Sequence, residues 1–324
     1  MRSSRRAAIG FTLAWYGLWA CGQASAQVAP QRADTVSLRF GWTAGLEARI
    51  ETTRFQEQVS GSADTMSGSA RYRMRVEPHG RGLLISYDDF EFPASADTTE
   101  AAQRSALAEQ AATMVPKVVV DSAGAFVGIE DVEAVRQRLD SLMVRMLEPD
   151  EAAAAREMLT KLVTEEALAG LAAQEWSAIV GRWAGADLEL GREYEFEEEA
   201  ALPLMPGTSV PMLATFAVER RTSCRDGGSD EDCVEIRLAA RADPAAVQQI
   251  LAQFAERLLA TPGLGIAFES FEMTNELMLI TEPSTLRPQR LRLSRGMTGI
   301  FTADGQRGEV SQSEQRTYQY TYLH

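Results

Sequence analysis

Alternation of apolar and polar residues is the feature that most constrains the fold of this 324-residue chain. From Ala70 to Val76 the apolar side chains alternate with Arg71, Arg73 and Arg75, and long stretches near the C-terminus show the same period of two. A period of two places successive side chains on opposite faces of a β-strand. Because short turns rich in Gly, Pro and Asp separate these stretches, the sequence predicts hairpin-linked antiparallel strands.

Helical patterns occur in blocks between the strand segments. The predicted order is a strand meander over 36–92, a helical block over 97–184 that contains a short hairpin at 117–127, and a strand-rich half over 187–324 with a helix at 243–260. This order predicts an α+β fold: a large, curved, half-barrel-like antiparallel sheet of about 10 to 11 strands with helices packed on one face. No Pro/Ser-rich linker interrupts 35–324, so a single domain is expected.

Two local predictions follow from turn and cap residues. The polar stretch 61–68 is predicted to be a turn between two strands of the meander. In the helix at 243–260, Asp243 is predicted to be the N-cap, Pro244 occupies the first helical position, and the segment Thr261-Pro262-Gly263 ends the helix.

The N-terminus has the pattern of an export signal. Basic residues at Arg2, Arg5 and Arg6 precede an apolar run that reaches Cys21, and Ala24-Ser25-Ala26 provides a small-x-small cleavage site. Residues 1–26 are therefore predicted to be a signal peptide and 27–34 a disordered segment. The expected location is periplasmic or secreted, without a membrane span, because the apolar run is shorter than the ~20 residues needed.

A second interpretation of the signal involves lipidation. The stretch from Leu18 to Gly22 resembles the lipobox of bacterial lipoproteins, in which the cysteine is lipidated, although Trp19 departs from that pattern. Lipidation at Cys21 would anchor the domain to a membrane. Both interpretations stay open at this point.

Charge excludes one class of partner. The 46 acidic residues outnumber the 32 basic ones, for a net charge of −14, and removal of the signal takes three arginines and no acid. Such a surface repels nucleic acid and anionic lipid, so no nucleic-acid partner is expected.

Two cysteines remain beyond the signal, Cys224 and Cys233. Alternating runs precede and follow them, which places them at the tip of a hairpin, and an even cysteine count in an oxidising compartment favours a disulfide. The same tip carries Asp226, Asp230, Glu231 and Asp232 within 225–232, but their spacing matches no calcium loop, and no metal site is predicted.

Recognisable catalytic chemistry is absent from the sequence. Histidine occurs only at His79, in a turn, and at His324, whereas acid–base catalysis and zinc sites rely heavily on this residue. No phosphate-binding loop, nucleophile elbow or dinucleotide motif is present. The chain is therefore expected not to be an enzyme and to need no cofactor.

Apolar residues of the helical block suggest a binding function. Met143, Met146, Met158, Trp176 and Trp183 would suit an adaptable lining for a lipid or acyl chain held between sheet and helices. The alternative is that these side chains form ordinary core and that the protein is a structural or protein-interaction component of the envelope. The oligomeric state stays open.

A resemblance agrees with export. The segment from Pro116 to Glu130, with its Asp121-Ser122-Ala123-Gly124 turn, resembles a family of uncharacterised secreted bacterial envelope proteins and lipoproteins. The tally of strands is similar to that of the open half-barrel of periplasmic lipoprotein carriers. These resemblances imply a compartment and a fold, and no functional residue carries over from them.

Overall fold

The computed structural model describes residues 34–60, 62–93, 116–146, 164–201, 209–225, 228, 230–247, 249–250, 266–303 and 306–323. Strands dominate this part of the chain. They are β1 (Thr35–Ser37), β2 (Glu47–Ser60), β3 (Ser62–His79), β4 (Gly82–Glu91), β5 (Lys117–Val120), β6 (Phe126–Glu130), β7 (Asp187–Glu189), β8 (Glu193–Ala201), β9 (Ser209–Thr222), β10 (Cys233–Ala242), β11 (Ile266–Thr281), β12 (Pro288–Ala303) and β13 (Gln306–Leu323). Helices with defined bounds are α2 (Val132–Met146), α4 (Glu165–Trp176) and the π-helix η1 (Ser177–Gly181).

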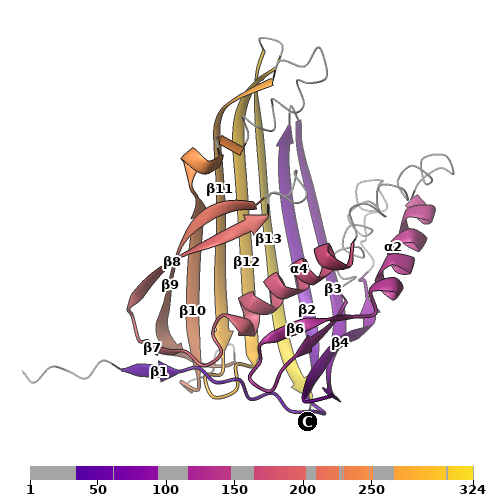
Figure 1. Cartoon of the computed structure of the whole chain (residues 1–324), viewed down its shortest axis with the longest axis vertical. Coiled ribbons are helices and arrows are strands. Elements are labelled where there is room, and N and C mark those ends of the chain that lie inside the picture. Colours follow the sequence, from indigo (N-terminus) through magenta and orange to yellow (C-terminus); the bar gives the residue numbers. More distant parts are fainter. Residues whose placement is uncertain are drawn as a thin grey trace, which may run out of the picture. The chain divides into compact units, whose positions relative to one another are not determined.

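One antiparallel sheet contains eleven of the strands, in the order β6-β5-β4-β3-β2-β13-β12-β11-β10-β9-β8 (Figure 1). Neighbours in each half follow the order of the chain. The two halves join where β2 pairs with β13, from Glu47 opposite Leu323 to Ser60 opposite Val310. The remaining strands, β1 and β7, form a separate two-stranded sheet. The antiparallel sheet predicted from the sequence is confirmed.

The predicted α+β class is wrong, because the described chain is mostly β. Strands make up 63% of it. The helices do not form a layer over one face of the sheet: α2 contributes only Val135 to the buried apolar residues described, and α4 with η1 covers a limited part of the sheet. The sequence prediction underestimated the strand content and so gave the helices too much weight. Strands of 14 to 18 residues continue past the apolar positions that alternate in the sequence.

The stretch 62–68 shows how polar residues enter such a strand. It was predicted to be a turn, but it belongs to β3 and pairs with β2, from Ser62 opposite Ser60 to Gly68 opposite Arg54. Backbone hydrogen bonds hold a strand pair together whether or not the side chains are apolar. Pairing with β2 therefore overrides the local preference for a turn.

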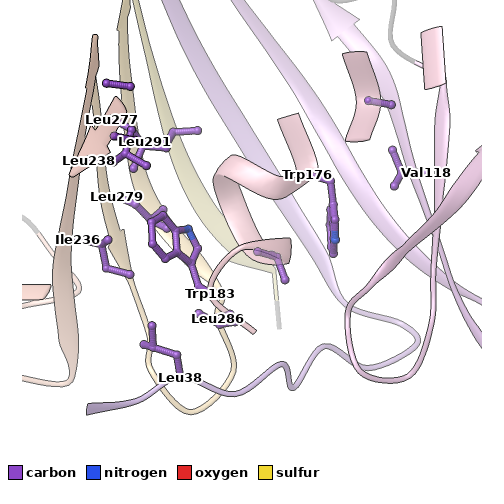
Figure 2. Packing of buried hydrophobic residues seen from close by; sticks show 14 of the residues in the cluster. Leu38, Val118, Trp176, Trp183, Ile236, Leu238, Leu277, Leu279, Leu286 and Leu291 are labelled. Atoms are coloured by element: carbon purple, nitrogen blue, oxygen red, sulfur yellow. The ribbon is translucent and has the colours of Figure 1, made fainter. Parts of the chain in front are cut away.

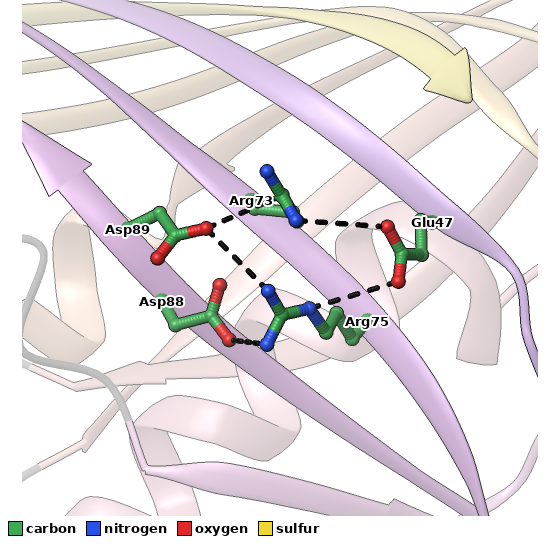
Figure 3. Close-up of polar contacts among 5 residues, drawn as sticks. All are labelled: Glu47, Arg73, Arg75, Asp88 and Asp89. Carbon is green, nitrogen blue, oxygen red and sulfur yellow. Dashed lines mark hydrogen bonds and ion pairs between the residues drawn. The ribbon is translucent and has the colours of Figure 1, made fainter.

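Alternation gives the sheet two different faces, of which the one that α4 packs against is here called the inner face. On β3, Ala70, Met74 and Val76 are buried on the inner face. Arg73 and Arg75, on the outer face, contact Glu47 on β2 and the carboxylates of Asp88 and Asp89 on β4, with the shortest distance 2.6 Å between Arg75 and Asp88 (Figure 3). These arginines are partly exposed, so the ion pairs solvate the outer face and each stabilises the fold only slightly.

The core lies between the inner face and the segment from α4 to β7. Trp183 is buried among Leu38, Ile236, Leu279 and Leu286 (Figure 2). Its indole N–H donates to the carbonyl of Ala178 at 2.9 Å, which satisfies the polar atom that burial would otherwise strand.

Trp176, the last residue of α4, fixes the helix to the β5–β6 hairpin. Its ring packs against Trp42 with the centroids 5.3 Å apart, and its indole N–H donates to the carbonyl of Gly124 at 2.7 Å. Gly124 has φ +86°, and a Cβ there would lie 2.6 Å from the ring of Phe40, so this turn requires glycine. Asp121 completes the turn by accepting hydrogen bonds from the N–H groups of Ala123 and Ala125.

The disulfide between Cys224 and Cys233 is present, as predicted, where β9 leads into β10. Such a bond is compatible with a location outside the cytoplasm. The predicted helix near 243 begins as expected: residues 244–247 and 249–250 are helical, and the Asp243 carboxylate accepts a hydrogen bond from the N–H of Ala245. Its continuation to 260, the signal peptide over 1–26 with Cys21, the segment 27–33, Met158 and the helix expected after 97 lie outside the described residues.

Candidate ligand cavity

A cavity of about 680 Å³ lies between α4 and the inner face of β10 to β13. This volume is within the roughly 300–1,000 Å³ typical of small-molecule sites. Helix α4 reaches this position because Thr164 caps it by accepting a hydrogen bond from Ala167 N–H at 3.1 Å, and because Trp176 holds its other end.

The apolar part of the lining comes from both the helix and the sheet. Leu168, Leu171, Ala172 and Glu175 are spaced to share one face of α4, and all four line the cavity. Leu171 is 58% exposed, which is unusual for a leucine next to a core and is explained by its position on an open cavity. The sheet contributes Leu238, Leu277 and Leu293 from three adjacent strands.

A charged group lies beside this apolar lining. Glu314 on β13 accepts hydrogen bonds from Arg54 on β2 at 2.9 Å and from Arg316 at 2.5 Å. Burial alone would raise the pKa of the Glu314 carboxyl, but the two guanidinium groups more than offset this and hold the pKa below its usual range. Glu314 is therefore ionised at neutral pH.

Glu175 projects into the cavity from the opposite side, from α4. Its side chain keeps an exposed surface, and that surface borders the cavity. Desolvation by the residues packed around it raises the pKa of Glu175, and attraction to Arg316 and Arg295 opposes the rise without cancelling it.

Tyrosines continue the inner face on β3, β4 and β13. Burial raises the pKa of Tyr72, Tyr87 and Tyr320 well above the usual value, so all three stay neutral. The rings of Tyr72 and Tyr87 meet edge to face with centroids 5.8 Å apart. The tyrosine side chains that surround Glu175 on the β3 and β4 side of the inner face are therefore polarisable but uncharged.

A second ion pair lies at the β8 side of the cavity. Arg182, just after η1, contacts Glu198 at 2.5 Å and stacks over the ring of Phe196, with its guanidinium carbon 5.0 Å from the centroid. Both charged side chains are partly buried. The charges of Arg182 and Glu198 therefore cancel, and the pair borders the cavity at β8 without adding net charge.

Of the residues predicted to line an apolar site, the structure describes the side chains of the two tryptophans. Trp176 and Trp183 belong to the packed core, only 3% and 1% exposed, and neither lines the cavity. Met143 and Met146 lie on α2, but their side chains and all of Met158 fall outside the described residues.

The sequence reasoning missed the cavity's charged residues. Arg54, Arg295, Glu314 and Arg316 occupy positions that alternate with outer-face residues on their strands. A charge at an inward position of an amphipathic strand was the available signal, because such a position is normally apolar. Recognising it required knowing which face of β12 and β13 is inner.

Other kinds of site receive no support from the described residues. In the ranges given above, no group of three or more His, Cys, Asp or Glu side chains could hold a metal ion. Within the same ranges, no helix is both long and apolar enough to cross a membrane. His79 lies 3.4 Å from the Glu130 carboxylate, and neither residue lines the cavity.

Comparison with known proteins adds little. No protein-family model and no curated protein matches the sequence, so the resemblance to secreted envelope proteins is not confirmed. Among solved structures, an outer membrane channel from Pseudomonas putida F1 is 8% identical over 87% of this chain and 97% of that chain, with a TM-score of 0.17. A TM-score this low carries no evidence about fold or function.

Proposed function

We propose that this chain is an exported envelope protein that binds an apolar ligand, such as a lipid or acyl chain, in the cavity between α4 and the sheet. The observation that carries the proposal is a cavity of about 680 Å³ with apolar side chains on both walls. A packed core would have filled this volume with side chains, because protein interiors are close-packed. The proposed role is binding or carriage and not catalysis.

Export supports the same proposal. The signal pattern at 1–26 and the Cys224–Cys233 disulfide agree with an oxidising compartment. In that aqueous compartment, a poorly soluble acyl chain would need a binding protein to shield it from water. Retention of Cys21 as a lipidated residue would tether the same binding domain to a membrane.

Two exposed leucines make a matched test of the proposal. Leu171, 58% exposed, lines the cavity, whereas Leu213, 55% exposed, is on the outer face of β9. The full chain, L171E and L213E would be expressed with export, purified without detergent and analysed for bound lipid by native mass spectrometry. Lipid on the wild type and on L213E but not on L171E is the expected result.

Two results would count against the proposal. Absence of lipid from the wild type in repeated preparations would favour a structural or protein-interaction role for the envelope. Equal amounts of bound lipid on L171E and L213E would show that the lipid binds outside this cavity.

A further inference from the structure

Charges around the cavity do not balance. Among the described residues, four arginines and three glutamates project toward it from the inner face, α4 and the residue after η1: Arg54, Arg182, Arg295, Arg316, Glu175, Glu198 and Glu314. Glu199 and Glu276 also border the cavity, but alternation along β8 and β11 points their side chains to the outer face. One positive charge is therefore in excess, in a chain whose net charge is −14.

The excess lies at Arg295. Arg182 pairs with Glu198, and Arg54 and Arg316 share Glu314. Arg295 forms no ion pair with another residue in the part of the chain that the structure describes, although Glu175 and Glu314 attract it at longer range. The Arg295 side chain is exposed and borders the cavity, so its guanidinium is accessible to a ligand and can pair with an anionic group there.

Polarity changes in steps along the strands. Arg295 lies directly opposite Asn275 on the neighbouring strand, and both line the cavity. Two residues farther along, the inner-face pair is Leu293 with Leu277, and the next is Leu291 with Leu279. Each step of two residues is about 6.6 Å, so a polar end and an apolar wall follow one another along the strand direction.

From this arrangement, and resting on the proposed function, we infer that the ligand is a single-chain amphiphile with an anionic head group. The head group binds the Arg295 guanidinium beside the Asn275 amide, and the alkyl chain runs along Leu277 and Leu293 toward α4. A carboxylate or phosphate oxygen suits the planar donor fork of arginine. Glu175, which faces this position from α4, disfavours a second negative charge on the ligand.

The test uses four probes with the same alkyl chain: dodecanoate, dodecyl phosphate, dodecanol and dodecylamine. The full-length mature protein would be titrated with each by calorimetry, below the concentration at which the probe forms micelles. At least one of the two anions should bind about ten- to a hundredfold tighter than dodecanol, as expected for a charge-assisted hydrogen bond. The tighter anion identifies the head group.

Variants locate the effect. R295Q should lose the preference for the anion while binding dodecanol as the wild type does, and R292Q, on the outer face of the same strand, should keep the preference. Equal binding of all four probes, or a preference that survives in R295Q, would overturn the anionic head group but leave the proposed function standing. Failure of every probe to bind the folded wild type would count against both.

Discussion

Glu175 on α4 and Glu314 on the sheet both face the cavity, but their pKa values are shifted in opposite directions. Glu314 is held ionised by two arginines, whereas Glu175 is desolvated by the protein around the cavity and its pKa is raised. Since the two carboxyls face one cavity, the contrast comes from their close partners and not from their location.

Replacing Glu175 by Gln tests this contrast. A raised pKa means that, between the pKa of the unfolded carboxyl and that of the folded one, the folded state holds a proton that the unfolded state has lost. Stability therefore falls as the pH rises through this window, and the loss is complete above the folded pKa. E175Q should unfold at higher urea than the wild type above the window and show no such gain below it.

Urea denaturation at a series of pH values measures the effect, with E166Q as the control because Glu166 lies exposed in the first turn of the same helix. A difference between E175Q and the wild type that does not change with pH would show that the Glu175 carboxyl is solvated like a surface acid.

At the scale of elements, α4 depends on its contact with the β5–β6 hairpin. Trp176 supplies both an aromatic contact with Trp42 and a hydrogen bond to Gly124. W176A should lower the free energy of unfolding by about 3–5 kcal/mol, as for other large buried aromatics. W176F, which keeps a ring but leaves the Gly124 carbonyl unpaired, should lose about 1–3 kcal/mol.

Denaturant unfolding of both variants, followed by circular dichroism, checks the order of these losses. Nearly equal stability of W176F and the wild type would mean that the hydrogen bond to Gly124 contributes nothing measurable.

The disulfide is expected to have a local effect. In the chain-entropy model, closing so short a loop between Cys224 and Cys233 stabilises the folded state by ~2.5 kcal/mol. The double variant C224S/C233S should lose about this amount and keep its strand content by circular dichroism. Unfolding of the variant at room temperature would show instead that the β9–β10 hairpin requires the bond to form.

Period-two alternation and turn residues were enough to predict the strand meander, the short hairpin and the strand-rich C-terminal half. The same reasoning failed at 62–68, where pairing with β2 decides the conformation, and in the balance between helix and strand. A local sequence pattern indicates which secondary structure a segment prefers. It does not indicate how far pairing with a neighbouring strand can lengthen that segment as a strand.

At the scale of the whole molecule, the pairing of β2 with β13 sets the arrangement. These strands are separated by most of the chain, and their contact places Arg54 beside Glu314 and Arg316. Neither segment contains a local pattern that indicates which strand it pairs with, so the charged group of the cavity could not be predicted from the sequence. The disulfide could be predicted, because both cysteines belong to one hairpin.

The central claim is that a ligand occupies the cavity between α4 and the inner face. Photo-crosslinking with a fatty acid that carries a diazirine on its alkyl chain, followed by peptide mass spectrometry, tests it directly. Labels on α4 around Leu168 and Leu171 and on the sheet at Leu238, Leu277 and Leu293 are the predicted result. Labels confined to the outer face, or scattered over the protein without competition by unlabelled fatty acid, would contradict the account.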